Sequence, residues 1–274
     1  MSTRAGTAPR AAATRPVRLR ATAQSEWIKF RSVRSAPAVL LATAVVLLVG
    51  GWLVSAGYRN GWATMPPADR AHFDPVYQSM RGIELAQLLV GALGVLTVTG
   101  EYTSGLVRGT FLATPQRVQV LATKALVLTA VVWVWSTALC FAAFLLGQHV
   151  LTAPATHAAL GQPGVLTAVF GGGLYLALVG LLGLFTGALV RRTPAALAAL
   201  FGVLLVVPVA VGMLPGRTGA LLGEFLPSTA GEEIWQLLHG GAYTLGPWQG
   251  LGVLTAYVSA AAAAALVLVR RRDA

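Results

Sequence analysis

Six long apolar stretches, separated by shorter polar segments, dominate the chain from residue 36 onward. A helix needs about 20 mostly apolar residues to cross a bilayer core about 30 Å thick, and long apolar runs of this kind predict membrane-spanning helices. We therefore expect an all-α, polytopic membrane protein with six transmembrane helices. The predicted spans cover residues 36–56, 83–99, 125–146, 165–190, 194–214 and 247–269.

The composition agrees with a membrane protein and excludes an ordinary soluble domain. Apolar residues make up 56% of the 274 residues and charged residues 11%, and the mean hydropathy is +0.71. Soluble domains carry roughly 25% charged residues. Since no region between the spans is long enough for a soluble domain, we expect residues 35–270 to form one membrane domain.

The first apolar stretch has an alternative interpretation as a secretory signal peptide. Val54-Ser55-Ala56, which precedes Gly57, resembles a small-residue cleavage site. A signal peptide has an apolar core of about 7–15 residues, however, and the stretch here is longer and begins after about 35 residues. We therefore favour its retention as the first span.

The positions of Lys and Arg predict the orientation of the chain, because cationic loops are retained in the cytoplasm. With the N-terminus inside, sixteen of the twenty cationic residues are cytoplasmic, and the four outside are Arg59, Arg70, Arg81 and Arg217. This distribution predicts a multi-pass protein of the cell (plasma) membrane with both termini cytoplasmic and residues 271–274 as a cytoplasmic tail. It also accounts for the net charge of +11 without a nucleic-acid partner.

The residues before the first span divide into two parts. Residues 1–16 are rich in Ala, Thr, Arg and Pro without periodicity, which is typical of a disordered basic leader. Residues 17–34 carry an apolar stripe at helical spacing, made by Leu19, Ala23, Trp27, Phe30 and Val33. We expect an amphipathic interfacial helix along the inner leaflet. The alternative is a basic anchor that only orients the first span.

A polar segment, residues 100–124, interrupts the apolar pattern between the second and third spans. Gly100 and Glu101 are expected to end the second span, and Thr114-Pro115 to begin the next helix, since Thr is a good N-cap and Pro a preferred first helical residue. Between them, residues 102–113 contain Leu106, Val107 and Phe111, which provide enough apolar surface for a short helix in the interface. Because such a helix is tied to two spans, a force on it can move both.

These segments resemble the membrane subunits of ATP-binding-cassette exporters of the type-2 (ABC-2) class. The resemblance rests on SEWIKFRSVRS at 25–35, on T-G-E-Y-x-x-G-x-x-R at 99–108, and on the continuation from Pro115-x-Arg117 to Lys124. It implies that residues 101–113 include a coupling helix that docks on a separate ATPase subunit. It also implies a dimer with a second permease copy or homologue. The coupling residues that it implies are Glu101, Tyr102, Gly105, Leu106, Arg108, Phe111, Pro115 and Arg117.

We accordingly expect a transport subunit that exports a hydrophobic or amphipathic substrate, such as a drug, lipid or peptide, by alternating access. The chain contains no G-x-x-x-x-G-K-[ST] phosphate-binding motif, so ATP and Mg²⁺ are expected on the partner chain. We also expect no catalytic set and no bound cofactor or metal in this chain. The alternative is an ion-coupled secondary transporter, although no charged residue is placed deep in a predicted span, or another polytopic membrane protein without an ATPase partner.

The longest outer connection, residues 215–246, contains a candidate gate. Thr229-Ala-Gly-Glu232 matches a capping box, and the short helix that it would open has Ile234 and Trp235 on its apolar face. We predict a re-entrant or interfacial helix, with Thr229, Glu232 and Trp235 at the outer end of the translocation path. A helical loop without a gating role is an equally good interpretation. For Gly183-x-x-x-Gly187 in the fourth span we favour helix packing over a role in lining that path.

Overall fold

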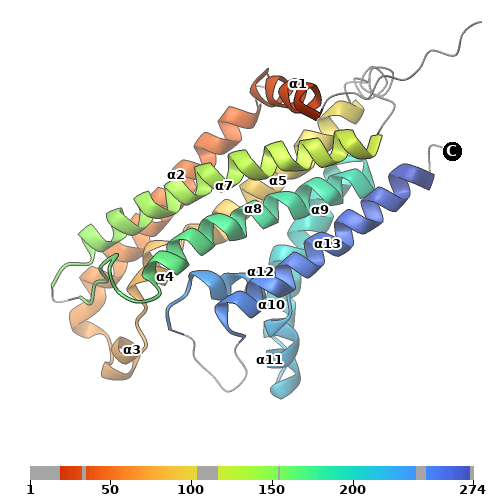
Figure 1. Ribbon diagram of the computed structural model, residues 1–274. Coiled ribbons are helices and arrows are strands. Elements are labelled where there is room, and N and C mark those ends of the chain that lie inside the picture. The colour runs from red at the N-terminus through yellow and green to blue at the C-terminus, as the bar shows by residue number, and fades with distance from the viewer. Residues whose placement is uncertain (1–18, 33–34, 104–116, 154, 239–244, 272–274) are drawn as a thin grey trace, which may run out of the picture.

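The computed structural model describes residues 19–32, 35–103, 117–153, 155–238 and 245–271, and this part of the chain is helical with no strand (Figure 1). The predicted all-α fold is confirmed, and six helices are long and apolar enough to cross a membrane. Such a set is typical of a multi-pass membrane protein. The helices and helical turns are α1 (Leu19–Ser32), α2 (Ser35–Gly61), η1 (Trp62–Thr64), α3 (Pro67–Ala71), α4 (Pro75–Ser79), α5 (Ile83–Thr103), α7 (Arg117–Val150), α8 (Val165–Val190), α9 (Thr193–Phe201), η2 (Gly202–Val206), α10 (Val207–Gly212), α11 (Arg217–Glu224), α12 (Pro227–Glu232), η3 (Glu233–Trp235) and α13 (Pro247–Arg271).

Three of the long helices, α2, α5 and α7, extend by four residues or more beyond the predicted spans. α7 is described from Arg117, eight residues before the predicted start at 125, so Lys124 lies inside a helix. α5 runs to Thr103 and therefore includes Glu101 and Tyr102. We had expected Tyr102 to lie instead in the separate short helix between the second and third spans. The apolar pattern marks only the stretch that fits a bilayer, and a helix can continue past it.

The fifth apolar helix is interrupted near its middle. η2 is a π-helical turn, Gly202–Val206, between α9 and α10. Pro208 follows it in the first turn of α10. Because proline lacks the backbone N–H that would bond to the carbonyl four residues earlier, it forces a local change in the helical ladder.

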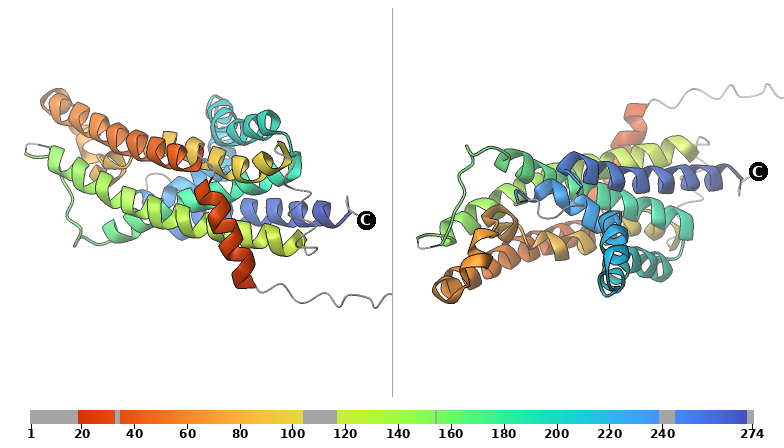
Figure 2. Two further views of the ribbon diagram at one scale, coloured as in Figure 1. Left: turned by 90° about the horizontal axis from the view of Figure 1, so that it is seen from above. Right: turned by 90° about the horizontal axis from the view of Figure 1, so that it is seen from below.

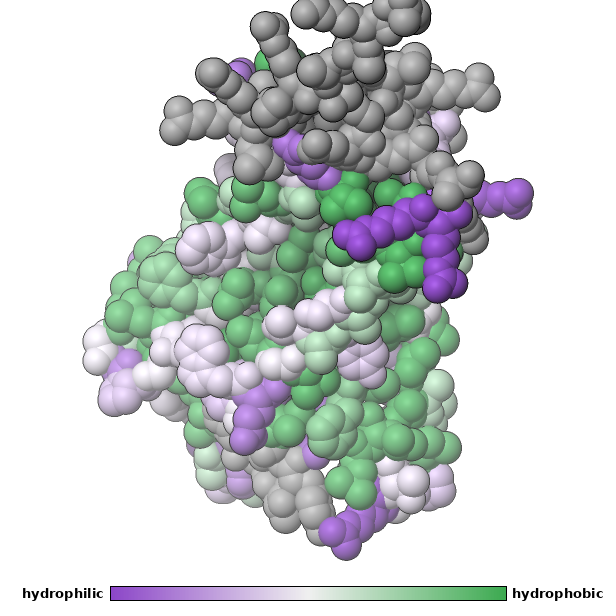
Figure 3. Space-filling view, turned by 45° about the vertical axis from the view of Figure 1, so that its right-hand side comes forward, coloured by the Kyte–Doolittle hydropathy of each residue, from purple (hydrophilic) through white to green (hydrophobic). Residues whose placement is uncertain are grey.

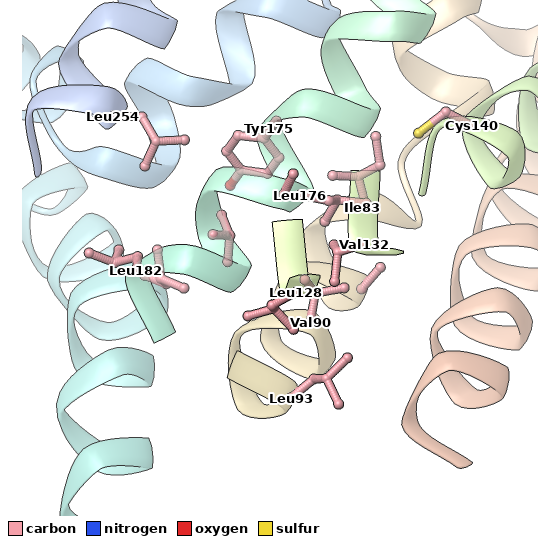
Figure 4. Close-up of a cluster of buried hydrophobic side chains, with 14 of the residues drawn as sticks. Ile83, Val90, Leu93, Leu128, Val132, Cys140, Tyr175, Leu176, Leu182 and Leu254 are labelled. Atoms are coloured by element: carbon pink, nitrogen blue, oxygen red, sulfur yellow. The ribbon is translucent and has the colours of Figure 1, made fainter. Parts of the chain in front are cut away.

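α8 lies at the centre of the bundle and packs against α5, α7 and α13. Figure 4 shows part of this core, where Leu93 of α5, Leu128 of α7 and Leu176 of α8 are each at most 2% exposed. Glycines let α5 and α8 approach closely: a Cβ on Gly94 would overlap the carbonyl oxygen of Gly180, and one on Gly183 would overlap that of Gly91. Gly183 therefore serves helix packing, as we expected.

The outer surface of the bundle is mostly apolar between its two ends, as the face in Figure 3 shows. Exposed apolar side chains include Leu126 of α7 and Val206 of η2. In water this surface would be unfavourable, whereas lipid tails can cover it.

The two ends of the bundle differ in structure. α1 lies across one end, near the end of α5 and the described start of α7 (Figures 1 and 2). The short helices α3, α4 and α11 lie toward the opposite end. We call these the α1 end and the α4 end.

Candidate functional site

Four charged side chains form a buried ion cluster at the α1 end: Glu26 and Lys29 of α1, Glu101 of α5 and Lys124 of α7. The Nζ of Lys124 donates to Oε2 of Glu26 at 2.5 Å and to Oε1 of Glu101 at 2.8 Å. The Nζ of Lys29 donates to Oε1 of Glu26 at 2.7 Å and lies 3.5 Å from Oε1 of Glu101. Each lysine thus contacts both carboxylates, and three helices meet at one point.

The four side chains of the ion cluster are buried to different degrees. The side chain of Glu26 is 3% exposed and that of Lys124 10%, whereas that of Lys29 is 34% exposed. Buried charges are tolerated when they are paired and hydrogen-bonded, and here two cations balance two anions. Burial by itself lowers the pKa of Lys29, but its hydrogen bond with Glu26 and the negative charges of Glu101 and Glu26 outweigh that effect and raise the pKa above its ordinary value.

The ion cluster depends on the face that α1 turns toward the bundle. Glu26 and Lys29 are three residues apart and Phe30 is four from Glu26, so the three share a helix face; Phe30 packs against the core. Trp27, which we placed on the apolar stripe, is 43% exposed. Of the other stripe residues, the side chains of Leu19 and Ala23, and all of Val33, lie outside the described part of the chain.

Sequence reasoning missed the ion cluster, although one signal for it was present. Lys29 and Lys124 are the only lysines among twenty cationic residues, and both belong to the cluster. An ammonium is a compact charge that fits between two carboxylates, whereas guanidinium is a planar fork. Lys124 lies inside α7 but one residue before the predicted third span, and none of the four residues of the ion cluster falls within a predicted span.

A cavity of about 340 Å³ lies beside the ion cluster, between α1, α2, α5 and α7. All four members of the ion cluster line it, together with a few other polar residues. Most of the remaining wall is apolar and comes from Phe30, Ala36, Leu93, Leu96, Val127 and Leu128. The α1 end thus combines an ion cluster without net charge and a mostly apolar cavity.

At the α4 end, the carboxylate of Asp74 joins two segments that are distant in sequence. Its Oδ1 accepts hydrogen bonds from the backbone N–H groups of Val76 and Tyr77, at 2.9 and 3.0 Å, and so caps α4. Its Oδ2 accepts from those of Leu237 and Leu238, at 2.6 and 3.1 Å. We call this arrangement the Asp74 clasp. It holds the segment after η3 against α4.

Trp235, a predicted gate residue, lies under the Asp74 clasp. Its side chain is fully buried, and its ring stacks on Tyr77 with centroids 4.7 Å apart and planes 16° apart. The hydroxyl of Tyr77 donates to Glu84 at 3.1 Å. Burial, with the charges of Glu232 and Glu84, raises the pKa of Tyr77, so the hydroxyl keeps the proton that it donates.

Glu232, another predicted gate residue, is partly buried at the end of α12. Burial, followed by repulsion from Glu84, raises its pKa to about 8. A carboxyl with such a pKa changes its charge near neutral pH. The sequence pattern placed Glu232 in the gate for a different reason, the capping box.

The predicted capping box is wrong. α12 begins at Pro227, so its N-cap is Leu226, three residues before the N-cap Thr229 that the motif indicates, and Leu226 makes no side-chain cap. Proline is pre-organised for the first helical position and sets the start. The hydroxyl of Thr229 instead donates to the carbonyl of Gly223 at 2.6 Å and ties α12 back to α11.

The predicted coupling residues are only partly within the described chain. Glu101 belongs to the ion cluster, and Tyr102 lies beneath the guanidinium of Arg191, whose carbon is 5.3 Å from the ring centroid. The side chain of Arg117 is not described. The remaining predicted residues, Gly105, Leu106, Arg108, Phe111 and Pro115, lie outside the described residues.

No model of a protein family matches this chain, and no curated protein matches it. Within the described ranges, no three His, Cys, Asp or Glu residues are grouped as a metal ion would require.

Proposed function

We propose that this chain is the membrane-spanning subunit of an ATP-driven exporter of the type-2 ABC class. In this proposal a separate ATPase subunit binds the segment around residues 101–113, and two membrane subunits form a dimer. The α1 end faces the cytoplasm, and α1 lies in the interface of the inner leaflet. The cargo is a hydrophobic or amphipathic molecule.

The ion cluster is the observation that carries the proposal. Residues 104–116 connect α5 to α7, and a partner that grips this segment pushes on both helices. Glu101 lies two residues before the end of α5 and Lys124 seven residues after the described start of α7. Lys124 forms an ion pair with Glu26 of α1. Glu101 is joined to Glu26 through the two lysines, Lys29 and Lys124, that both carboxylates share. Because breaking a buried ion pair costs about 3–5 kcal/mol, we expect α1, α5 and α7 to move as one unit.

The α4 end would provide the second gate that alternating access needs. Trp235, Glu232 and Thr229 belong to a segment held over the bundle by the Asp74 clasp. To release a substrate on the outer side, this segment has to separate from α4. Closing of the ATPase subunits would supply the energy for that step, transmitted from the α1 end through the long helices.

A proton-driven carrier is the second candidate function, and one observation favours it. Glu232 has a pKa raised to about 8 and can therefore bind and release a proton near neutral pH. The two candidates differ in the energy source. A carrier needs a pH gradient, whereas the proposed exporter needs ATP and a partner subunit.

The first experiment is to purify the tagged full chain from its native membrane in mild detergent and identify the proteins that accompany it. The proposal predicts an ATPase with a phosphate-binding loop. ATP hydrolysis by the complex should respond to candidate substrates, and Glu101→Gln should weaken that response while insertion in the membrane is retained. If no such ATPase accompanies the chain, and transport in vesicles follows a pH gradient without ATP, the carrier is the correct function.

A further inference from the structure

We propose that the cavity between α1, α2, α5 and α7 binds a single-chain amphipathic anion, with its acyl chain inside the cavity and its anionic head on Lys29. Binding is a property of this chain alone. The proposal therefore does not depend on the ATPase partner and is tested without it.

The volume and lining of the cavity favour one acyl chain. Its volume of about 340 Å³ is at the small end of the roughly 300–1,000 Å³ that ligand cavities span. The side chains of Phe30, Leu93, Leu96, Val127 and Leu128 form an apolar wall that contributes no charge. Burying an acyl chain there is favourable by about 0.8 kcal/mol for each CH₂ taken from water.

The ion cluster places a cation where the ligand head would lie. Lys29 lines the cavity and is the most exposed member of the ion cluster. Its contact with Glu101, at 3.5 Å, is the longest of the four ion pairs in the cluster. An anion that replaced Glu101 beside this ammonium would leave the shorter contact with Glu26 in place.

Charge around the cavity selects an anion over a cation. Glu26 and Glu101 each contact both lysines, so a cationic ligand would have to compete with two ammonium groups for them. Among described side chains at the α1 end, these two carboxylates are accompanied by seven cations: Lys29, Arg31, Lys124, Arg191, Arg192, Arg270 and Arg271. The resulting positive potential attracts an anionic head.

Two head groups fit this chemistry, the carboxylate of a fatty acid and the phosphate of a lysophospholipid. The probe for the test is a fluorescent polyene fatty acid, cis-parinaric acid, titrated into the full chain in neutral-detergent micelles. Its methyl ester is the uncharged counterpart. Competition by lauric acid and by lauroyl-lysophosphatidic acid identifies which head the site prefers.

The variants separate specific binding from attraction to a basic surface. Lys29→Gln should weaken binding of the acid at least tenfold and leave the ester unaffected. Arg31→Gln is the matched control, because Arg31 is an exposed cation on the same helix that does not line the cavity. It should change binding less than twofold. Leu96→Trp, which fills the cavity and keeps the ion cluster, should abolish binding of the acid while the thermal unfolding curve stays cooperative.

The proposal is wrong if Lys29→Gln and Arg31→Gln weaken binding equally, or if the ester binds the wild-type chain as tightly as the acid. It is also wrong if Leu96→Trp binds the acid normally, or if neither competitor displaces the probe. Displacement by one competitor or by both supports the site and assigns its head group.

Discussion

Replacing Lys124 by glutamine should destabilise the folded chain by about 3 kcal/mol. The substitution removes two short charge-assisted hydrogen bonds, at 2.5 and 2.8 Å, and leaves two carboxylates with one lysine. Removing one partner of a buried ion pair costs about 3–5 kcal/mol. We expect the lower end of this range, because Lys29 still contacts both Glu26 and Glu101.

The assay is unfolding of the purified full chain in neutral detergent, by heat and by a denaturing detergent. Arg81→Gln is the matched control, since Arg81 and Glu84 form an ion pair at 2.8 Å in which both side chains are about a third exposed. Exposed pairs contribute at most about 1 kcal/mol. The variant in the ion cluster should therefore lose at least twice as much stability as the control.

Two further variants test the reason for the loss. Combining Glu26→Gln with Lys124→Gln removes one charge of each sign, so the double variant should be more stable than Lys124→Gln alone. Lys124→Arg keeps the charge but places a planar fork in a site that holds an ammonium, and we expect a loss of about 1–2 kcal/mol from overpacking. If Lys124→Gln costs no more than Arg81→Gln, the ion cluster is not an interdependent buried unit. The same conclusion follows if the loss of the double variant equals the sum of the losses caused by Glu26→Gln and Lys124→Gln separately.

Three predictions concern the rest of the bundle, each measured by thermal unfolding in neutral detergent. Asp74→Ala should cost about 3 kcal/mol, because it removes a helix cap and the two hydrogen bonds that join Asp74 to the segment after η3; a loss no greater than that caused by Asp69→Ala, at an exposed position, would contradict the Asp74 clasp. The wild-type chain should lose up to about 3 kcal/mol between pH 6 and pH 8, because Glu232 keeps its proton up to about pH 8 when folded and releases it near pH 4.5 when unfolded; a Glu232→Gln variant with the same decline would show that another group is responsible. Gly94→Ala should destabilise by about 1–3 kcal/mol or more, since its methyl would overlap a backbone carbonyl of α8, whereas Gly57→Ala, with open space around it, should be neutral or slightly stabilising; equal effects would refute the close α5–α8 contact.

Apolar patterning predicted the long helices well where a local signal also ends the helix. α8 was predicted at 165–190 and spans Val165–Val190, because Gly164 and Arg191 adopt left-handed backbone conformations on either side of it. α7 has no such break near residue 125, and polar residues extend it to Arg117. Hydropathy therefore locates the part of a helix that fits a bilayer and underestimates the length of the whole helix.

The ion cluster could not be derived from local patterns, because its members come from three helices. Glu26 and Lys124 are 98 residues apart, and only the packing of α1 across α7 brings them together. The stripe on α1 was an incomplete guide for the same reason, since Trp27 is exposed and the face toward the bundle carries Glu26. The local motif at Thr229 misled us where Pro227 supplied a stronger helix start.

The most direct test of the proposed function is whether ATP at the α1 end moves the α4 end. Spin labels at two exposed positions, Ala71 at the end of α3 and Phe225 before α12, report the distance across the Asp74 clasp in the complex purified with its ATPase. Labelled chain is diluted with unlabelled chain in lipid nanodiscs, and distances are measured by pulsed electron paramagnetic resonance. We predict that ATP lengthens this distance in the wild-type complex and that Lys124→Gln abolishes the change. A distance that stays the same with and without ATP in the wild-type complex would contradict the account.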